Sequence, residues 1–137
     1  LIAMVLALLS NLLIQSLGDH AEPQKLVTLI AEESTKKENI WTLIFFVVMS
    51  VAVAPIVEEI LFRGILYPAI KQIGHPRLAA IGTALLFALF HVNLLTFASL
   101  AVVALGLIAL YEFTDNLLAP ITAHAVFNAS NLVMLIW

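Results

Sequence analysis

Three charged side chains, Glu58, Glu59 and Arg63, interrupt the otherwise apolar body of this chain. The remaining Lys, Arg, Asp and Glu residues lie in stretches that are typical of loops or interfaces. Hydrophobic residues make up 63% of the sequence and charged residues 11%, whereas a soluble domain carries about a quarter charged residues. The composition therefore predicts an integral, multi-pass membrane protein in contact with the lipid bilayer. A charge at membrane depth costs several kcal/mol, so these three residues need a partner or a function.

Composition also excludes several classes of function. The formal net charge of -3 is spread over loops and there is no basic patch, so no nucleic-acid partner is expected. The absence of Cys excludes disulfides, thiolate metal sites and thiol nucleophiles. No HExxH sequence occurs, and no Ser lies in a GxSxG context. Ser130 in the last helix is expected to form a hydrogen bond rather than to react.

The chain divides into two parts. Residues 1–39 are predicted to contain the end of a membrane helix, over 1–17, and a polar segment in which Pro23 opens a short helix, either interfacial or solvated. Because the sequence begins at Leu1 without a charged leader, we interpret it as the C-terminal portion of a longer protein with earlier helices. Residues 40–137 are predicted to form the functional core.

Five helices are predicted in the core, and Pro55 separates the first two. Their predicted bounds are 40–57, 58–73, 78–92, 97–110 and 117–137, with breaks at 74–76, 93–96 and 111–116. Several of these runs are shorter than the roughly 20 residues that a membrane span needs. Short helices with polar residues are tolerated in a membrane when other helices shield them. The predicted fold is therefore all-α, a polytopic membrane helical bundle with a membrane-embedded polar pocket.

If the first two of these helices cross the membrane separately, most basic residues lie on one side, which would be cytoplasmic. These residues are Lys25, Lys36, Lys37, Lys71 and Arg77. The same arrangement places Glu58 and His91 towards the opposite face, whereas His124 enters from the basic side. The three side chains then meet only in the middle of the membrane, so Pro55 or the start of the Glu58 helix is expected to dip inward.

Helical spacing separates the roles of the two adjacent glutamates. Glu59 and Arg63 are four residues apart in the favoured acid-then-base order, so they are predicted to pair. Glu58 is five residues before Arg63 and faces elsewhere, which leaves one carboxylate over. The alternative is that all three residues form one buried ion-pair cluster that only fixes packing.

Two further pairs have the same spacing of four residues. Phe87 shares a helix face with His91, so its ring is expected to pack beside the imidazole and restrict it. His124 shares a face with Asn128. A single His in an apolar helix is more often a packing residue than a ligand. Two such His residues, an Asn and an unpaired Glu together make independent packing roles a poor explanation.

These side chains support two kinds of chemistry. In the first, a carboxylate takes a proton from water, a His helps to hold that water, and other donors stabilise the oxyanion. In the second, Glu58, His91 and His124 hold zinc or another divalent metal with one position open. Asn is a poor zinc ligand and a good oxyanion donor, which favours the first kind, without a required cofactor.

The motifs occur in a fixed order in one small all-helical chain. They are Glu58-Glu59-x-x-x-Arg63, Phe87-x-x-x-His91 and His124-x-x-x-Asn128, within VAPIVEEILFRGILYPAI, LLFALFHVNLL and LLAPITAHAVFNA. Over about residues 40–137 the chain resembles the CPBP family, that is, type II CAAX prenyl endopeptidases and their prokaryotic relatives, often called Abi proteins. This family is usually labelled as metalloproteases. The turn at 111–115 departs from the family, which often has a basic residue and a Gly there.

The resemblance implies an intramembrane endopeptidase. Its substrate would be a membrane-associated or lipid-modified protein or peptide; prenylated CAAX proteins are one such class, which prokaryotic members need not use. The resemblance assigns water activation to Glu58 and His91 and the oxyanion site to His124 and Asn128. It also implies that two further residues, Glu59 and Arg63, hold the site together.

Two other functions remain open at this stage. A non-catalytic membrane chaperone or immunity protein would bind a peptide in the same pocket and would tolerate replacement of Glu58 and His124. A small transporter or channel would use the same groups as a proton relay. Transporters usually have paired repeats with broken helices, and none are visible in this sequence.

Overall fold

The computed structural model describes residues 40–93 and 96–136. The membrane helix and the short helix predicted within 1–39 lie outside the described residues. Every regular element in the described ranges is a helix. The predicted all-α fold is confirmed for this part of the chain.

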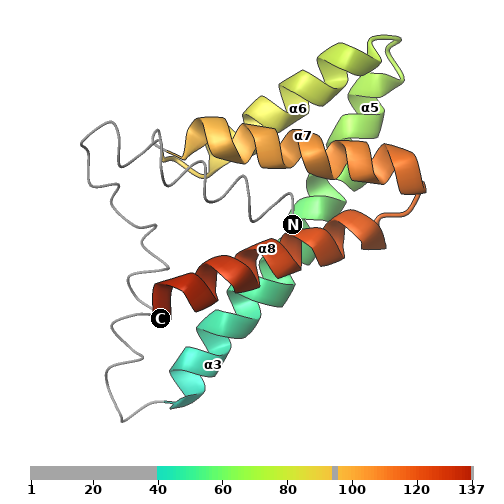
Figure 1. The fold of residues 1–137 in the computed structure, drawn as a ribbon. Coiled ribbons are helices and arrows are strands. Elements are labelled where there is room, and N and C mark those ends of the chain that lie inside the picture. The colour runs from blue at the N-terminus through green and yellow to red at the C-terminus, as the bar shows by residue number, and fades with distance from the viewer. Residues whose placement is uncertain (1–39, 94–95, 137) are drawn as a thin grey trace.

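The first element is one continuous helix from Ile40 to Lys71, which we call the long helix (Figure 1). Its parts are α3 (Ile40–Val48), the π-helical segment η1 (Met49–Val53), α4 (Ala54–Glu59), the π-helical segment η2 (Ile60–Leu66) and α5 (Tyr67–Lys71). The prediction of two separate helices, 40–57 and 58–73, is therefore wrong. Pro55 lies inside the long helix and does not end it.

The two π-helical segments explain why the prolines do not break the long helix. Pro55 and Pro68 are each the second residue after a π-helical segment. A proline inside an α-helix lacks an N–H donor, and its ring clashes with the carbonyl four residues earlier. In η1 the Ala54 N–H bonds the Met49 carbonyl, five residues earlier, so the turn is widened. We attribute the continuity of the helix to this wider turn, which leaves room for the ring.

Three shorter helices follow, namely α6 (Pro76–Phe90), α7 (Phe97–Thr114) and α8 (Leu118–Ile136). The predicted break before α6 is confirmed, and Gly74 adopts a φ of 97° there, which favours glycine. Helix α7 runs four residues beyond the predicted end at Leu110. The turn predicted at 111–116 is therefore wrong for its first four residues, and α7 ends at Thr114, followed by Asp115 with a φ of 47°.

The helices form a bundle around a small apolar core. Helices α6 and α7 pack side by side, α6 also contacts α5, and α8 contacts α7, α4 and η1 (Figure 1). The buried core side chains come from the long helix, α6 and α7. They are Phe62, Tyr67, Ala79, Ala84, Phe87, Ala104 and Ile108. This packing brings α8 across the middle of the long helix, where the two glutamates lie.

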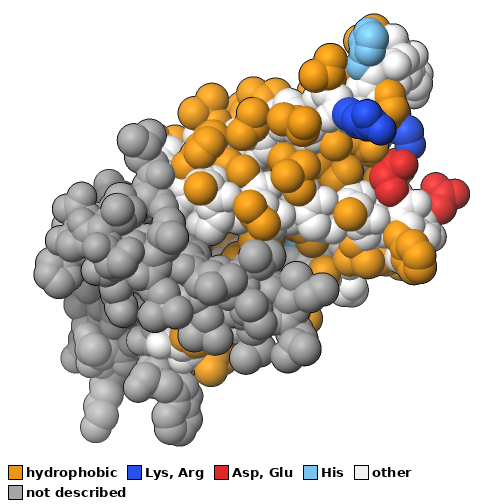
Figure 2. Space-filling model, turned by 45° about the horizontal axis from the view of Figure 1, so that its top comes forward, with side chains coloured by type: hydrophobic (Ala, Val, Ile, Leu, Met, Phe, Trp, Pro, Cys, Tyr) orange, Lys and Arg blue, Asp and Glu red, His pale blue; other side chains and the backbone are white. Residues whose placement is uncertain are grey.

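Among the described residues, two helices are long and apolar enough to cross a membrane, the long helix and α7. Only 6% of the most apolar window of the long helix is buried inside the protein, so most of its side chains face outward. Apolar side chains cover most of the described surface in Figure 2, and charged side chains gather at one end. This distribution suits a protein whose sides contact lipid.

The continuous long helix corrects the predicted topology. Its 32 residues span roughly 45 Å, enough for one complete crossing. The two separate crossings that would have placed Lys71 beside the basic residues of 1–39 do not occur. Glu58 lies near the middle of the long helix, so a crossing by this helix would place it at mid-membrane depth without any inward dip of the chain.

Candidate active site

A buried ion pair forms the centre of the polar cluster. Arg63 Nη1 donates to Glu59 Oε1 at 2.8 Å, and both side chains are 0% exposed. Arg63 Nη2 donates to the Ala104 carbonyl of α7 at 3.0 Å, and the guanidinium lies 4.8 Å from the centre of the Phe87 ring. The predicted pairing of Glu59 with Arg63 is confirmed. Such a pair tolerates burial only with additional hydrogen bonds, which α7 supplies.

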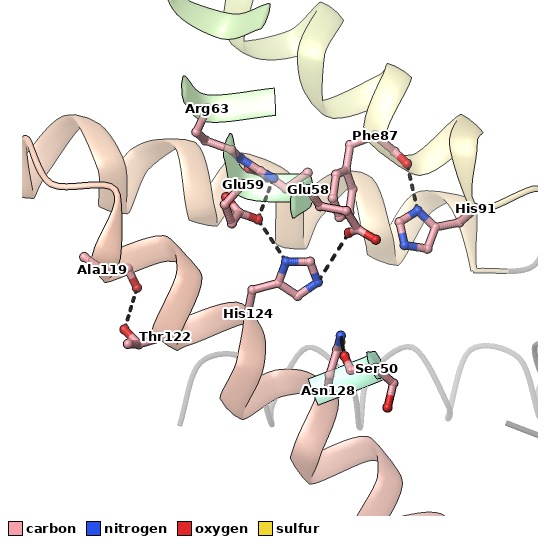
Figure 3. Close-up of polar contacts among 11 residues, drawn as sticks. Ser50, Glu58, Glu59, Arg63, Phe87, His91, Ala119, Thr122, His124 and Asn128 are labelled. Atoms are coloured by element: carbon pink, nitrogen blue, oxygen red, sulfur yellow. Dashed lines mark hydrogen bonds and ion pairs between the residues drawn. The ribbon is translucent and has the colours of Figure 1, made fainter. Parts of the chain in front are cut away.

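His124 reaches this ion pair from α8. Its Nδ1 donates to Glu59 Oε1 at 2.9 Å, and the residue is 4% exposed. One carboxylate oxygen therefore accepts from both Arg63 and His124 (Figure 3). The spacing argument did not predict this contact, because it joins residues 65 positions apart on different helices. Glu59 thus fixes the orientation of the His124 ring.

Glu58 stays outside the ion pair, as the spacing predicts. Its Oε2 lies 3.8 Å from His124 Nε2, too far for a direct hydrogen bond. This oxygen is buried and has no hydrogen-bond partner, whereas the side chain as a whole is 29% exposed. Glu58 is thus a free carboxylate beside an oriented imidazole.

His91 lies just after the last residue of α6. Its Nδ1 donates to the Phe87 carbonyl at 2.9 Å, which leaves Nε2 available. The rings of Phe87 and His91 lie 4.7 Å apart, so the predicted packing is confirmed. The Phe87 ring also lies 5.7 Å from the His124 ring, so it contacts both imidazoles. No hydrogen bond or ion pair joins Glu58 to His91 within the described ranges.

Asn128 lies one turn after His124 on α8. Its Nδ2 donates to the Ser50 carbonyl of η1 at 2.9 Å, which ties α8 to the long helix (Figure 3). One of its two amide hydrogens is engaged in this bond, and the other remains for a second partner. The expected contact of Ser130 is local, since its hydroxyl donates to the Val126 carbonyl in the same helix.

The backbone partners of the site were not foreseen from the sequence. The carbonyls of Ser50 and Ala104 accept from Asn128 and Arg63, and a backbone carbonyl carries no signal in residue identity. Thr83 was also not identified. It is 0% exposed, and its hydroxyl has no hydrogen-bond partner among the described residues.

The side chains as placed do not fit a metal centre. Over residues 40–93 and 96–136, no three His, Asp or Glu side chains come together as a metal site would require. Each imidazole uses its Nδ1, in His91 for the Phe87 carbonyl and in His124 for Glu59, and a metal-ligating histidine holds its second nitrogen in the same way, so these bonds do not bear on metal binding. Since no three such side chains come together in the described ranges, we derive no chemical step through a metal.

Fold and site together define a helical membrane protein with a buried acid–base cluster. Residues 40–130 match the model of the family described as Rce1-like, type II CAAX prenyl endopeptidase, and the chain belongs to this family. It is thus a member of a family of membrane endopeptidases. No curated protein and no solved structure matches the chain.

Proposed function

We propose that this protein is a multi-pass intramembrane endopeptidase in which Glu58 activates water. The observation that carries the proposal is the position of Glu58: its buried Oε2 has no hydrogen-bond partner and lies 3.8 Å from His124 Nε2, on a side chain that is 29% exposed. The adjacent Glu59 is 0% exposed, and its Oε1 already accepts from Arg63 and His124. A carboxylate that stays outside an ion pair in an apolar setting can accept a proton from water. Family membership supports peptide hydrolysis as the reaction.

The first step is the attack of water on the scissile carbonyl. Glu58 takes one proton from the water, and His91 Nε2 accepts a hydrogen bond from the same molecule. The new carbon–oxygen bond forms as the carbonyl π-electrons move to oxygen. Because the His91 ring is packed against Phe87 and bonded to its carbonyl, the direction of Nε2 is fixed before substrate arrives.

Stabilisation of the oxyanion falls to α8. His124 Nε2–H and the second amide hydrogen of Asn128 both donate to the developing negative charge. Glu59 supports this role, since its bond to Nδ1 orients the ring, and donation from both ring nitrogens takes place in the imidazolium form. In the second step Glu58 passes its proton to the departing amine nitrogen, the carbon–nitrogen bond breaks, and a carboxylic acid is released.

The substrate follows from the location of the site. Glu58 lies near the middle of the long helix, among helices whose outer surfaces are apolar. A peptide bond reaches such a site when its chain is already held at the membrane, by an apolar segment or a lipid group. We therefore propose a membrane-associated or lipid-modified protein or peptide as substrate, with prenylated CAAX proteins as one class. No metal or other cofactor enters this mechanism.

The test is a cleavage assay with purified protein in lipid vesicles. Membrane-anchored peptides with and without a prenyl group are offered to the wild type and to Glu58→Gln. A general base is typically worth about 10²–10⁴ in rate, so Glu58→Gln should lose at least that much while its melting temperature is kept. Glu112→Gln is the matched control, because Glu112 is an exposed carboxylate that pairs with Lys71 away from the site. It should cleave normally.

Two results would contradict the proposal. Near-normal cleavage by Glu58→Gln would remove its role as base. A purified protein that binds the peptides but never cleaves them, with Glu58 and His124 both replaceable without loss of biological function, would instead indicate a non-catalytic peptide-binding protein.

A further inference from the structure

The Ser50 carbonyl is left without its helical donor by the local sequence. In a regular α-helix it would accept from Ala54, four residues later. In η1 the Ala54 N–H bonds the Met49 carbonyl instead. The next donor in the π-helical pattern would be the N–H of residue 55, and residue 55 is proline, which has none.

Asn128 takes the place of that missing donor. Its Nδ2 lies 2.9 Å from the Ser50 carbonyl oxygen, and this bond joins residues 78 positions apart. Pro55 is less than 2% exposed, so the region around it is dry and a buried unpaired carbonyl there would be costly. The contact between α8 and η1 therefore includes a hydrogen bond that the proline itself makes necessary.

The bond also has a consequence for the orientation of the amide. Asn128 carries two amide hydrogens in one plane, so fixing one of them on Ser50 fixes the direction of the other. His124, one turn earlier on the same face of α8, is fixed by Glu59 in a similar way. Both donors of the proposed oxyanion site are thus held by the long helix.

We propose that Pro55 is a positioning residue that acts through the Ser50 carbonyl. Because Pro55 has no backbone N–H, the Ser50 carbonyl remains available to accept a hydrogen bond from Asn128. This bond orients the Asn128 amide so that its second hydrogen points towards the site. The anchoring concerns structure alone. Its effect on cleavage rests on the proposed function.

The test is a double-mutant cycle between Pro55→Ala and Asn128→Ala, read by melting temperature in detergent and by cleavage rate. Asn128→Ala leaves the Ser50 carbonyl unpaired and should lower the melting temperature by about 4 °C. Pro55→Ala supplies an N–H near that carbonyl, so in the Asn128→Ala background it should restore at least half of this loss. In the wild-type background it should give no such gain, since Asn128 already fills the role.

Cleavage should show the same coupling. In Pro55→Ala alone, the new N–H of residue 55 competes for the Ser50 carbonyl, so the Asn128 side-chain amide loses its fixed orientation. We expect kcat to fall about tenfold with KM little changed, which is a part of the roughly 10²–10³ expected for complete loss of an oxyanion donor. In the Asn128→Ala background Pro55→Ala should cause no further loss.

Pro68→Ala provides the matched control for additivity. Pro68 also follows a π-helical segment and forms no described bond with Asn128. Its effect on melting temperature should be the same with and without Asn128. If Pro55→Ala is equally additive with Asn128→Ala, the inference is overturned, whether or not the protein is a peptidase. If the melting cycle shows the coupling and no variant, including wild type, cleaves any peptide, the anchoring stands and the proposed function fails.

Discussion

Glu58 and Glu59 are neighbours in one helix, yet they meet different surroundings. Successive helical residues point about 100° apart, so only one of them can face the Arg63 side of the long helix. Glu59 takes that position, is fully buried, and accepts from two donors, Arg63 of the long helix and His124 of α8. Glu58 is turned towards the edge of the cluster, and its side chain is 29% exposed. The difference in burial makes the two acids separable by mutation.

Glu59→Gln should primarily impair folding. The substitution leaves Arg63 buried without its carboxylate and removes the acceptor of His124, and breaking a buried pair costs about 3–5 kcal/mol. Membrane yield and melting temperature should both fall. Arg63→Gln should share this defect, and the Glu59→Gln/Arg63→Gln double variant should recover part of the yield. A stable but inactive Glu59→Gln beside an active Glu58→Gln would reverse the roles of the two acids.

Phe87 combines a core position with contacts to the site. It is 1% exposed and belongs to the apolar core, so Phe87→Ala would lower the free energy of unfolding by about 3–5 kcal/mol. A loss of activity in that variant could then result from unfolding alone. Phe87→Leu is a sharper change, because it keeps most of the volume at a cost of about 1–2 kcal/mol while removing the ring beside both imidazoles. We expect a cleavage rate at least tenfold lower, with only a modest fall in melting temperature.

Phe62→Leu is the matched control for this prediction. Phe62 is 4% exposed and packs edge-on against Phe87 at 5.1 Å, so it has a similar place in the core. It should show the same modest loss of stability with little loss of cleavage. Equal losses of activity in the two leucine variants would mean that the Phe87 ring acts only through packing.

At the scale of elements, the end of α7 has a strained backbone conformation, which a glycine would relieve. Asp115 ends the helix with a φ of 47°, in the left-handed region where a Cβ is crowded. Glycine has no such penalty and is the usual residue at this position. Asp115→Gly should therefore raise the melting temperature by about 2 °C and leave cleavage unchanged, as measured by thermal unfolding in detergent.

Asp115→Ala tests the reason for that gain. Alanine keeps the crowded Cβ and lacks the short polar side chain that makes Asp tolerable in this conformation, so it should lower the melting temperature. If both substitutions stabilise the protein equally, the backbone conformation is not the cause.

At the scale of the whole molecule, the arrangement of donors favours hydrolysis without a metal. The described His, Asp and Glu side chains do not converge as a metal centre requires. We predict that purified, active protein contains no stoichiometric transition metal and that exhaustive chelation leaves its activity intact. Elemental analysis beside the cleavage assay checks this. One zinc per chain, with activity lost on removal and restored on return, would refute it.

The sequence by itself determined those features that depend on composition and on spacing within one helix. Its apolar composition predicts an all-helical membrane protein, and the family resemblance rests on three short motifs. The pairing of Glu59 with Arg63 and the packing of Phe87 on His91 follow from a separation of four residues, which places two side chains on one helix face wherever the helix lies.

Only the tertiary structure decided how the helices meet. The predicted break at Pro55 was wrong because a π-helical turn absorbs the proline, and this depends on backbone geometry that residue identity does not reveal. The bond of His124 to Glu59 and that of Asn128 to Ser50 depend on the position of α8 across the long helix. Local spacing cannot predict the first bond, because contacts between helices depend on how whole helix faces pack. It cannot predict the second, because a backbone carbonyl acceptor is the same at every position of the sequence.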